Sequence, residues 1–133
     1  MNLSSIRIIT ADIKNLVQFY ENITGMSFTW YTDDFAELKT SSAALAIGST
    51  RTLALFGGDD VARAANNKSV IIEFQVDDVD NKYQQIMNTP GLVVVQKPTT
   101  MPWGNRSLLF RDIDGHLVNF FTPMSQEAKR RFE

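Results

Sequence analysis

Two strands joined by a tight turn are predicted by the stretch Pro102-Trp-Gly-Asn-Arg-Ser-Leu-Leu-Phe-Arg-Asp-Ile-Asp-Gly-His-Leu-Val-Asn-Phe-Phe-Thr122. Its middle, Asp112-Ile-Asp-Gly115, contains residue types that favour turns, because Asp bonds its own backbone and Gly tolerates positive φ. Apolar residues dominate on both sides, as expected for strands that pack on a core. An aromatic loop, Pro102-Trp-Gly104, leads into this hairpin. We therefore expect strands near Arg106–Arg111 and Leu117–Thr122.

The chain repeats one strand–helix pattern. Residues 5–25 and 71–91 align without a gap at an offset of 66 (71 − 5), which places Asp12 opposite Asp78. Alternating apolar residues precede each aspartate, and apolar residues at helical spacing follow it. Aspartate is a preferred N-cap residue, so each half is expected to contain a strand, a helix and then further strands.

A second offset relates the later strands of the two halves. At an offset of 72 (112 − 40), Thr40–Ile47 aligns with Asp112–Asn119, so Ile47 falls opposite Asn119. The support is the strand–turn–strand pattern, together with Leu45 opposite Leu117. The remaining strands are expected near Met26–Tyr31, Phe35–Lys39, Ala43–Gly48 and Leu92–Gln96, with a further apolar run at Thr52–Phe56.

Composition limits the class of protein. The chain has 133 residues, 44% of them hydrophobic, which is enough for one substantial core. A formal net charge of −2 argues against nucleic-acid binding, because neutralising phosphates needs a clustered basic surface. The chain has no cysteine, no signal-peptide pattern, and no apolar run of the roughly 20 residues that a membrane span needs. We expect a cytoplasmic protein that binds neither nucleic acid nor membrane.

Two copies of strand, helix and three strands, together with the Asp112–Gly115 hairpin, resemble the vicinal-oxygen-chelate superfamily, the glyoxalase/bleomycin resistance protein/dioxygenase proteins. The helix entries Ala11-Asp-Ile13 and Val76-Asp-Asp-Val-Asp80 also carry the resemblance. It implies a homodimer and an α+β fold in which two βαβββ modules form curved mixed sheets around a cavity. The expected divisions of this single domain, residues 1–133, are a first module at 4–57, a linker at 58–68, a second module at 69–123 and a C-terminal tail at 124–133.

The resemblance also implies that the strand face containing Asn119 is a cavity wall. Directly opposed residues of a hairpin share a face. For a turn at Asp112–Gly115, the opposed pairs are expected to be Leu117 with Phe110, Asn119 with Leu108, and Phe121 with Arg106. His116, Val118 and Phe120 would then share the other face.

An apolar wall with isolated polar groups suits a small organic ligand, although such residues can also simply fill a barrel core. Trp30 and Trp103 are candidate stacking platforms, as in antibiotic-binding members of the family, and packing at a dimer interface is the alternative role. The expected ligand-binding residues are Trp30, Trp103, Arg106, Phe110, Asn119, Phe121, Arg7 and Gln75.

Metal-dependent members of the family bind one divalent ion with His, Glu or Gln from the first and last strands of each module. The matching positions here are Ser5, Ile47, Ile71 and Asn119. Two are aliphatic, and neutral Ser and Asn are weak ligands for metals that prefer imidazole and carboxylate. The single histidine, His116, is predicted to lie on the outer face in a surface or packing role. We expect no metal and no other cofactor.

Three classes of function remain open. The first is a metal-free protein that binds a small, partly aromatic organic ligand in a cavity. The second is an enzyme of the same superfamily: a lyase or dioxygenase with a displaced metal site, or an isomerase or hydrolase that uses Glu73 as acid or base. For Glu73, a charge pair with Arg7 or Arg106 is the simpler interpretation. The third is a dimer that binds a partner without a small ligand. The sequence favours the first.

Overall fold

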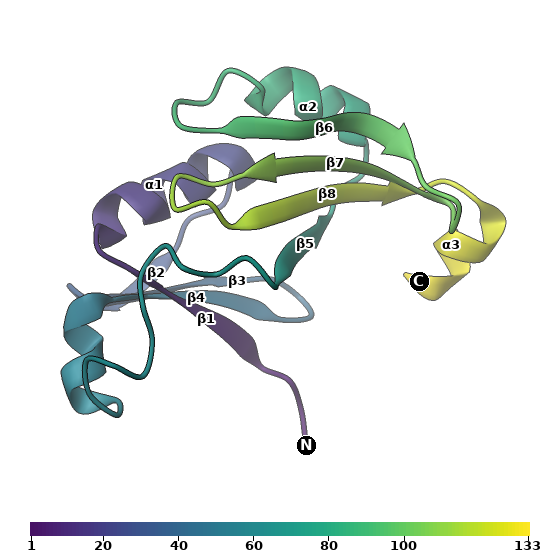
Figure 1. The fold of residues 1–133 in the computed structure, drawn as a ribbon. Coiled ribbons are helices and arrows are strands. Elements are labelled where there is room, and N and C mark those ends of the chain that lie inside the picture. Colours follow the sequence, from purple (N-terminus) through teal and green to yellow (C-terminus); the bar gives the residue numbers. More distant parts are fainter. The chain divides into compact units, whose positions relative to one another are not determined.

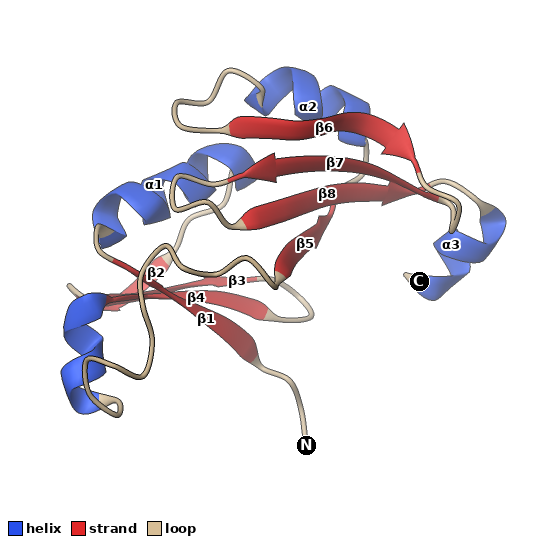
Figure 2. Cartoon of the chain, viewed as in Figure 1, coloured by secondary structure: helices blue, strands red, loops and turns tan.

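The chain folds into two compact units, Met1–Asn67 (unit 1) and Lys68–Glu133 (unit 2), in a computed structural model that describes all residues from 1 to 133. Figure 1 labels the helices and strands of both units, and Figure 2 colours them by type. Each unit contains one four-stranded mixed sheet and a helix between its first two strands. The predicted α+β class and the repeated βαβββ order are confirmed.

Unit 1 combines one parallel and two antiparallel strand pairs in the order β1-β4-β3-β2. Its elements are β1 (Ser5–Thr10), α1 (Ile13–Thr24), β2 (Thr29–Thr32), β3 (Phe35–Lys39), β4 (Ala44–Ser49) and the 3-10 helix η1 (Thr50–Leu55). The first and last strands are the parallel pair, because the chain crosses over through α1 and the β2–β3 hairpin before β4 forms. Most of the apolar run at 52–56 lies in η1.

Helix α1 forms where the sequence predicts it, and both of its ends are capped. The Asp12 carboxylate accepts the N–H of Asn15 at 3.2 Å, which satisfies one of the free N–H groups of the first turn. Gly25 ends the helix at φ 71° and donates its N–H to the carbonyl of Glu21. The buried side of α1 carries Leu16 and Tyr20 with their helical neighbours, so the helix is held by its apolar face.

Unit 2 repeats this plan in the order β5-β8-β7-β6. Its elements are β5 (Ile71–Gln75), α2 (Val79–Ile86), β6 (Val93–Thr100), β7 (Asn105–Arg111), β8 (Leu117–Pro123) and α3 (Gln126–Arg131). Asp78 caps α2 by accepting the N–H of Asn81 at 3.1 Å, as predicted. Helix α3 falls in the expected C-terminal tail. None of the chain's helices has the length and apolar character that crossing a membrane requires.

The core of unit 2 lies between its sheet and α2. Phe120 of β8 makes edge-to-face contacts with Phe110 of β7, at 5.0 Å between ring centroids, and with Phe74 of β5, at 5.6 Å. Val79 and Ile86 of α2 are buried as well. Aromatic pairs in this geometry contribute about 0.5–1.5 kcal/mol beyond the area they bury. The predicted helix side of β5, which carries Ile72 and Phe74, is confirmed.

The register of the β7–β8 hairpin differs from the prediction by one residue. Asn119 lies opposite Leu109, not opposite Leu108. The reason is the length of the turn. Asp112 donates its N–H to the carbonyl of His116 at 3.0 Å, so three residues separate this closing pair, and each opposed pair moves by one position.

The same turn explains a wrong alignment between the two units. In unit 1, the shorter turn is closed by Thr40 and Ala43, with Lys39 opposite Ala44. The offset between equivalent residues of the two units is therefore 72 before the turn and 73 after it. Ser5 pairs with Ala44 in unit 1, and the equivalent Ile71 pairs with Leu117 in unit 2, which gives 117 − 44 = 73. The counterpart of Asn119 in unit 1 is thus Ala46. The predicted counterpart, Ile47, is instead fully buried on the other side of the sheet.

Candidate functional site

The face of the unit 2 sheet turned away from α2 combines apolar and polar side chains. We call it the Asn119 face and define it by Ile71, Glu73, Gln75, Ser107, Leu109, Leu117, Asn119 and Phe121, which the strand register places together. Glu73 pairs with Asn119 across the parallel strands, and Gln75 pairs with Phe121. Three of the predicted ligand-binding residues, Gln75, Asn119 and Phe121, therefore do share one face.

The centre of this face is a hydrogen-bonded pair of side chains. The amide Nδ2 of Asn119 donates to Oε2 of Glu73 at 2.8 Å. An ionised carboxylate only accepts hydrogen bonds, so Asn119 must turn its NH₂ group toward Glu73 and its carbonyl oxygen away. That oxygen, Oδ1, is buried and has no hydrogen-bond partner. Asn119 itself is only 7% exposed.

Phe121 occupies the end of the Asn119 face next to α3. Its ring lies 5.0 Å from the ring of Phe132, which follows α3, and only 6% of the residue is exposed. The C-terminal segment therefore covers this part of the face. Sequence periodicity could not show this contact, because Phe132 lies outside the repeated module.

Arg106 and Phe110 lie on the opposite side of the sheet from Asn119, so their predicted place in one wall with Asn119 is wrong. Arg106 reaches α2, where its Nε and Nη2 donate to the two oxygens of Asp80 at 2.9 and 3.0 Å. Phe110 is fully buried against Phe120. The extra residue in the turn is the cause, because a one-residue shift exchanges the two faces of a strand. Arg106 consequently does not neutralise Glu73.

The corresponding face of unit 1, turned away from Ile8 and Ile47, presents an arginine among aromatic rings. We call it the Arg7 face and define it by Ser5, Arg7, Ile9, Tyr31, Phe35, Glu37, Lys39, Ala44, Ala46, Gly48 and Phe56. The guanidinium carbon of Arg7 lies 4.3 Å from the ring centroid of Phe35 and 4.9 Å from that of Phe56. Both distances are in the range of cation–π contacts.

A second cation on the Arg7 face is held by a tyrosine. Nζ of Lys39 lies 5.5 Å from the ring centroid of Tyr31, and its interaction with the Tyr31 side chain raises the pKa of the Lys39 ammonium above its ordinary value. Tyr31 also stacks on Phe35 at 5.7 Å between centroids. The sequence pattern did not indicate Tyr31, Phe35 or Phe56 as site residues. The alternation in β3 places Phe35 with Glu37 and Lys39, but no local signal brings Phe56, which follows η1, to this face.

The two tryptophans lie in different surroundings. Trp30 pairs with Ala36, which places it on the side of the sheet opposite Arg7, and it is partly exposed. Trp103 lies in the turn between β6 and β7 and is 59% exposed. Gly104 fixes this turn at φ 93°, where a Cβ would collide with Ser125. The turn thus presents an accessible ring on a defined backbone, and its role as a stacking platform remains a prediction.

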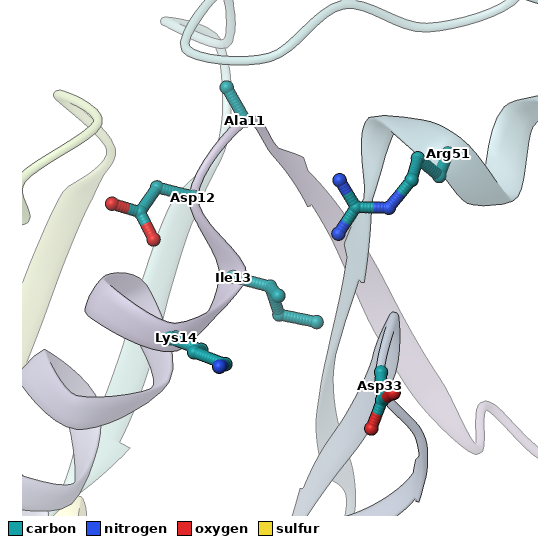
Figure 3. A pocket seen from close by; sticks show the side chains of 6 residues that line it. All are labelled: Ala11, Asp12, Ile13, Lys14, Asp33 and Arg51. Atoms are coloured by element: carbon teal, nitrogen blue, oxygen red, sulfur yellow. The ribbon is translucent and has the colours of Figure 1, made fainter.

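A charged depression of about 480 Å³ opens at the start of α1 (Figure 3). It is lined by Ala11, Asp12, Ile13, Lys14, Asp33 and Arg51. Two of its four charged side chains already have structural roles, since Asp12 caps α1 and Arg51 bonds Asp34 through Nε at 2.7 Å. This bond lowers the pKa of the Asp34 carboxyl, with help from the Ser49 hydroxyl. The charges of the depression are best explained by the cap of α1 and by a solvated ion pair that joins η1 to the β2–β3 turn.

The single histidine is buried at the β7–β8 turn, which agrees with the predicted packing role and not with a surface role. Nδ1 of His116 lies 2.8 Å from Oδ2 of Asp112, and both residues are buried. The hydrogen bond that the imidazole donates to Asp112 raises the pKa of His116, against the opposing effect of burial. The hydrogen bond to Asp112 therefore holds the His116 side chain at the turn.

The positions that match the metal ligands of the family carry a poor donor set. Ser5 and Asn119 are neutral, and Ile71 is aliphatic. The observed register assigns the fourth position to Ala46 in place of Ile47, and the Ala46 side chain has no donor atom. No group of three or more His, Cys, Asp or Glu side chains is placed to hold a metal ion. These residues do not fit the divalent site of the metal-dependent members.

Comparison with known proteins gives one family and one fold. The family model of the Glyoxalase/Bleomycin resistance protein/Dioxygenase superfamily matches residues 2–120. The uncharacterized protein YraH of Bacillus subtilis (strain 168) is 27% identical over 127 residues, which cover 91% of this chain and 98% of that protein.

Two solved structures show the same fold at low sequence identity. A glyoxalase/bleomycin resistance protein/dioxygenase family enzyme from Burkholderia phytofirmans PsJN superposes with a TM-score of 0.82 at 16% identity, covering 93% of this chain and all of that chain (100%). A glyoxalase-related enzyme from Fulvimarina pelagi gives a TM-score of 0.76 at 16% identity, covering 96% of this chain and 94% of that chain. Together with the family match, the two four-stranded mixed sheets show that this chain belongs to the glyoxalase/bleomycin resistance protein/dioxygenase superfamily.

Proposed function

We propose that this protein binds a small, partly aromatic organic molecule at the Asn119 face and that it does so without a metal. The observation that carries the proposal is the buried carbonyl oxygen of Asn119, which has no partner. Leaving a buried acceptor unsatisfied costs about 1–3 kcal/mol, so such a group in a folded protein calls for an explanation. A ligand N–H or O–H group that reaches this oxygen, after movement of the side chains that exclude solvent from it, supplies one.

The surroundings of Asn119 support an organic ligand. Leu109 and Leu117 are half-buried beside it, and Ile71 at the end of the face is exposed. Apolar area of this kind contributes affinity, while one oriented polar pair contributes specificity. Glu73 fixes the orientation of the Asn119 amide and therefore selects a donor, not an acceptor, on the ligand.

The proposed absence of a metal follows from the residue types at the family positions. Ser5, Ala46, Ile71 and Asn119 together offer no imidazole and no carboxylate. Glu73 beside Asn119 is a single carboxylate. A single carboxylate with neutral oxygen ligands holds Zn²⁺ or Mn²⁺ weakly compared with the His and Glu sets of metal-dependent sites.

Matched pairs of planar compounds test this function. Each aromatic compound with an N–H or O–H donor is screened beside its N-methyl or O-methyl derivative, and binding is measured as a rise in melting temperature. Donor compounds should stabilise the wild-type protein more than their methylated partners. Asn119→Leu should remove this difference. If the wild-type protein does not distinguish the two members of any pair, the proposed role of Asn119 is wrong.

Asn105 provides a matched control for this test. It is also 7% exposed, and its Oδ1 is also buried without a partner. It lies opposite Pro123 at the far end of β7, whereas Asn119 lies opposite Leu109. Asn105→Leu should therefore keep the preference for donor compounds. Loss of the preference in this variant alone would move the site to the α3 end of the sheet.

The enzymatic alternative, with Glu73 as acid or base, is favoured by one observation: Asn119 orients the Glu73 carboxylate at 2.8 Å on a partly exposed face. Glu73→Gln separates the two functions. In a binding protein, Glu73→Gln should weaken the preference for donor compounds, because the Asn119 amide is no longer held in one orientation, and neither protein should convert a compound. In an acid–base enzyme, the wild-type protein should convert a bound compound and the variant should lose this turnover, followed by mass spectrometry.

We further propose that the protein is a homodimer in solution. Val93 and Val95 on the edge strand β6 are exposed, and exposed apolar edge strands favour pairing with a second chain. Light scattering coupled to gel filtration measures the mass directly, and a mass near the 15.0 kDa of one chain would contradict the proposal.

A further inference from the structure

Arg7 has an unusual environment for an exposed arginine. Its guanidinium group contacts two aromatic rings, Phe35 at 4.3 Å and Phe56 at 4.9 Å. Within unit 1 the only ion pair joins Arg51 to Asp34, so no carboxylate of this unit neutralises Arg7. Ring faces are not conventional hydrogen-bond acceptors, so the guanidinium N–H groups of Arg7 have no oxygen acceptor within unit 1.

The neighbouring strand makes room for this arrangement. Arg7 pairs with Ala46, and Gly48 follows two residues later on the same face of β4. A Cβ added at Gly48 would lie 3.6 Å from Cδ of Arg7 and 3.1 Å from Oγ1 of Thr52. The arginine side chain therefore crosses β4 over two small residues and reaches the ring of Phe35 on β3. Longer side chains at these two positions would block this path.

We infer that the Arg7 face is a binding site for the carboxylate group of a planar aromatic acid. The edge of a guanidinium presents N–H groups in the spacing that a carboxylate accepts with both oxygens. The flanking rings restrict the rotamers of Arg7, which reduces the conformational entropy lost on binding. Tyr31 and Phe56, which are 48% and 66% exposed, offer ring surfaces for the aromatic part of the same molecule.

The charges around Arg7 favour a singly charged acid over a phosphate. Glu37 lies in register with Arg7 across Ala46, on the same face, at a separation of about 10 Å expected for two strand spacings. Its negative charge opposes a dianion more than a monoanion. The second cation of the face, Lys39, already contacts Tyr31, with its Nζ 5.5 Å from the ring centroid. One available guanidinium balances one carboxylate.

This site belongs to unit 1, and it is inferred independently of the Asn119 face in unit 2. The test uses 2-naphthoate and its neutral analogue 2-naphthamide as probes, with affinity measured by isothermal titration calorimetry. The wild-type protein should bind 2-naphthoate about 10- to 100-fold more tightly than the amide, as expected for a charge-assisted bidentate contact. Arg7→Gln should reduce 2-naphthoate binding to the level of the amide.

Three further variants separate charge from geometry and provide controls. Arg7→Lys keeps the positive charge but loses the planar fork, so it should retain only part of the preference. Arg130→Gln removes one exposed arginine from α3 of unit 2, which is not part of the Arg7 face, and should retain the full preference. Asn119→Leu should also retain it, because the two sites are inferred from different residues.

The outcomes distinguish this inference from the proposed function. Equal binding of naphthoate and naphthamide, or an unchanged preference in Arg7→Gln, would overturn the carboxylate site and leave the Asn119 proposal intact. A chemical-shift change of the Arg7 Nε–H group on adding naphthoate, in ¹⁵N-resolved NMR of the wild-type protein, gives a readout that does not depend on the folding of a variant. The absence of this shift at saturating naphthoate would equally overturn the inference.

Discussion

His116 and Asp112 form a buried hydrogen-bonded pair that closes the turn between β7 and β8, with Nδ1 2.8 Å from Oδ2. The other carboxylate oxygen, Oδ1, accepts the backbone N–H groups of Asp114 and His116, each at 2.9 Å. One carboxylate thus fixes both the side chain of His116 and the three-residue loop. The register of the hairpin, and with it the composition of the Asn119 face, depends on this turn.

The pair should make stability depend on pH. Its hydrogen bond raises the pKa of folded His116 above the unfolded value of about 6.5. The stabilisation is therefore fully present below about pH 6.5 and is lost as the pH rises through the raised pKa of the folded state. We expect the difference in unfolding free energy between wild type and His116→Gln to shrink from about pH 6 to about pH 9. Urea denaturation measures it, and a difference that grows with pH would contradict the assignment.

Removal of the charge on Asp112 should weaken the turn. Asp112→Asn leaves His116 without its carboxylate partner in a buried site and should destabilise the protein by about 3 kcal/mol at neutral pH. Asp33→Asn, at an exposed aspartate, is the control and should change the unfolding free energy by less than about 0.5 kcal/mol. Equal effects of the two substitutions would show that the Asp112 contacts contribute little.

Two adjacent leucines test the observed register. Leu108 is 1% exposed on the α2 side, whereas Leu109 is half-buried on the Asn119 face. Leu108→Ala should cost about 3 kcal/mol, in the range for buried leucines, and Leu109→Ala about 1 kcal/mol or less. The predicted register would give the reverse order. Chemical denaturation of the two variants under the same conditions decides between the registers.

A glutamate at position 119 should not create a metal site. Asn119→Glu places a second carboxylate beside Glu73, and the like charges should destabilise the protein by about 1 kcal/mol at neutral pH. The adjacent positions Ile71, Leu117 and Phe121 offer no further ligand. Calorimetry with Zn²⁺ and with Mn²⁺ is expected to show no tight binding. Stoichiometric, tight binding would mean that the metal positions are assigned wrongly.

The sequence alone indicated the family through features that are local in the chain. Asp12 and Asp78 cap helices at equivalent places, and the alternation in β5 assigned Ile72 and Phe74 to the helix side. Hydrogen bonds of caps and the period of a strand are set by neighbours a few residues apart, so they are readable without tertiary contacts. The weak donor set at the metal positions was also readable, because it depends only on residue type.

The composition of each face was not readable in the same way, because it depends on register and on contacts between distant segments. Because the Asp112–His116 turn has one more residue than expected, Arg106 and Phe110 lie on the face opposite Asn119. For the same reason, the residue of unit 1 that corresponds to Asn119 is Ala46, not Ile47. The cation–π contacts of Arg7 needed Phe56 from beyond η1, and the cover on Phe121 needed Phe132 from beyond α3. Local chemistry thus determined the elements and the family. The tertiary structure decided which side chains meet, because strand pairing fixes each side chain to one of two faces and a shift of one residue exchanges them.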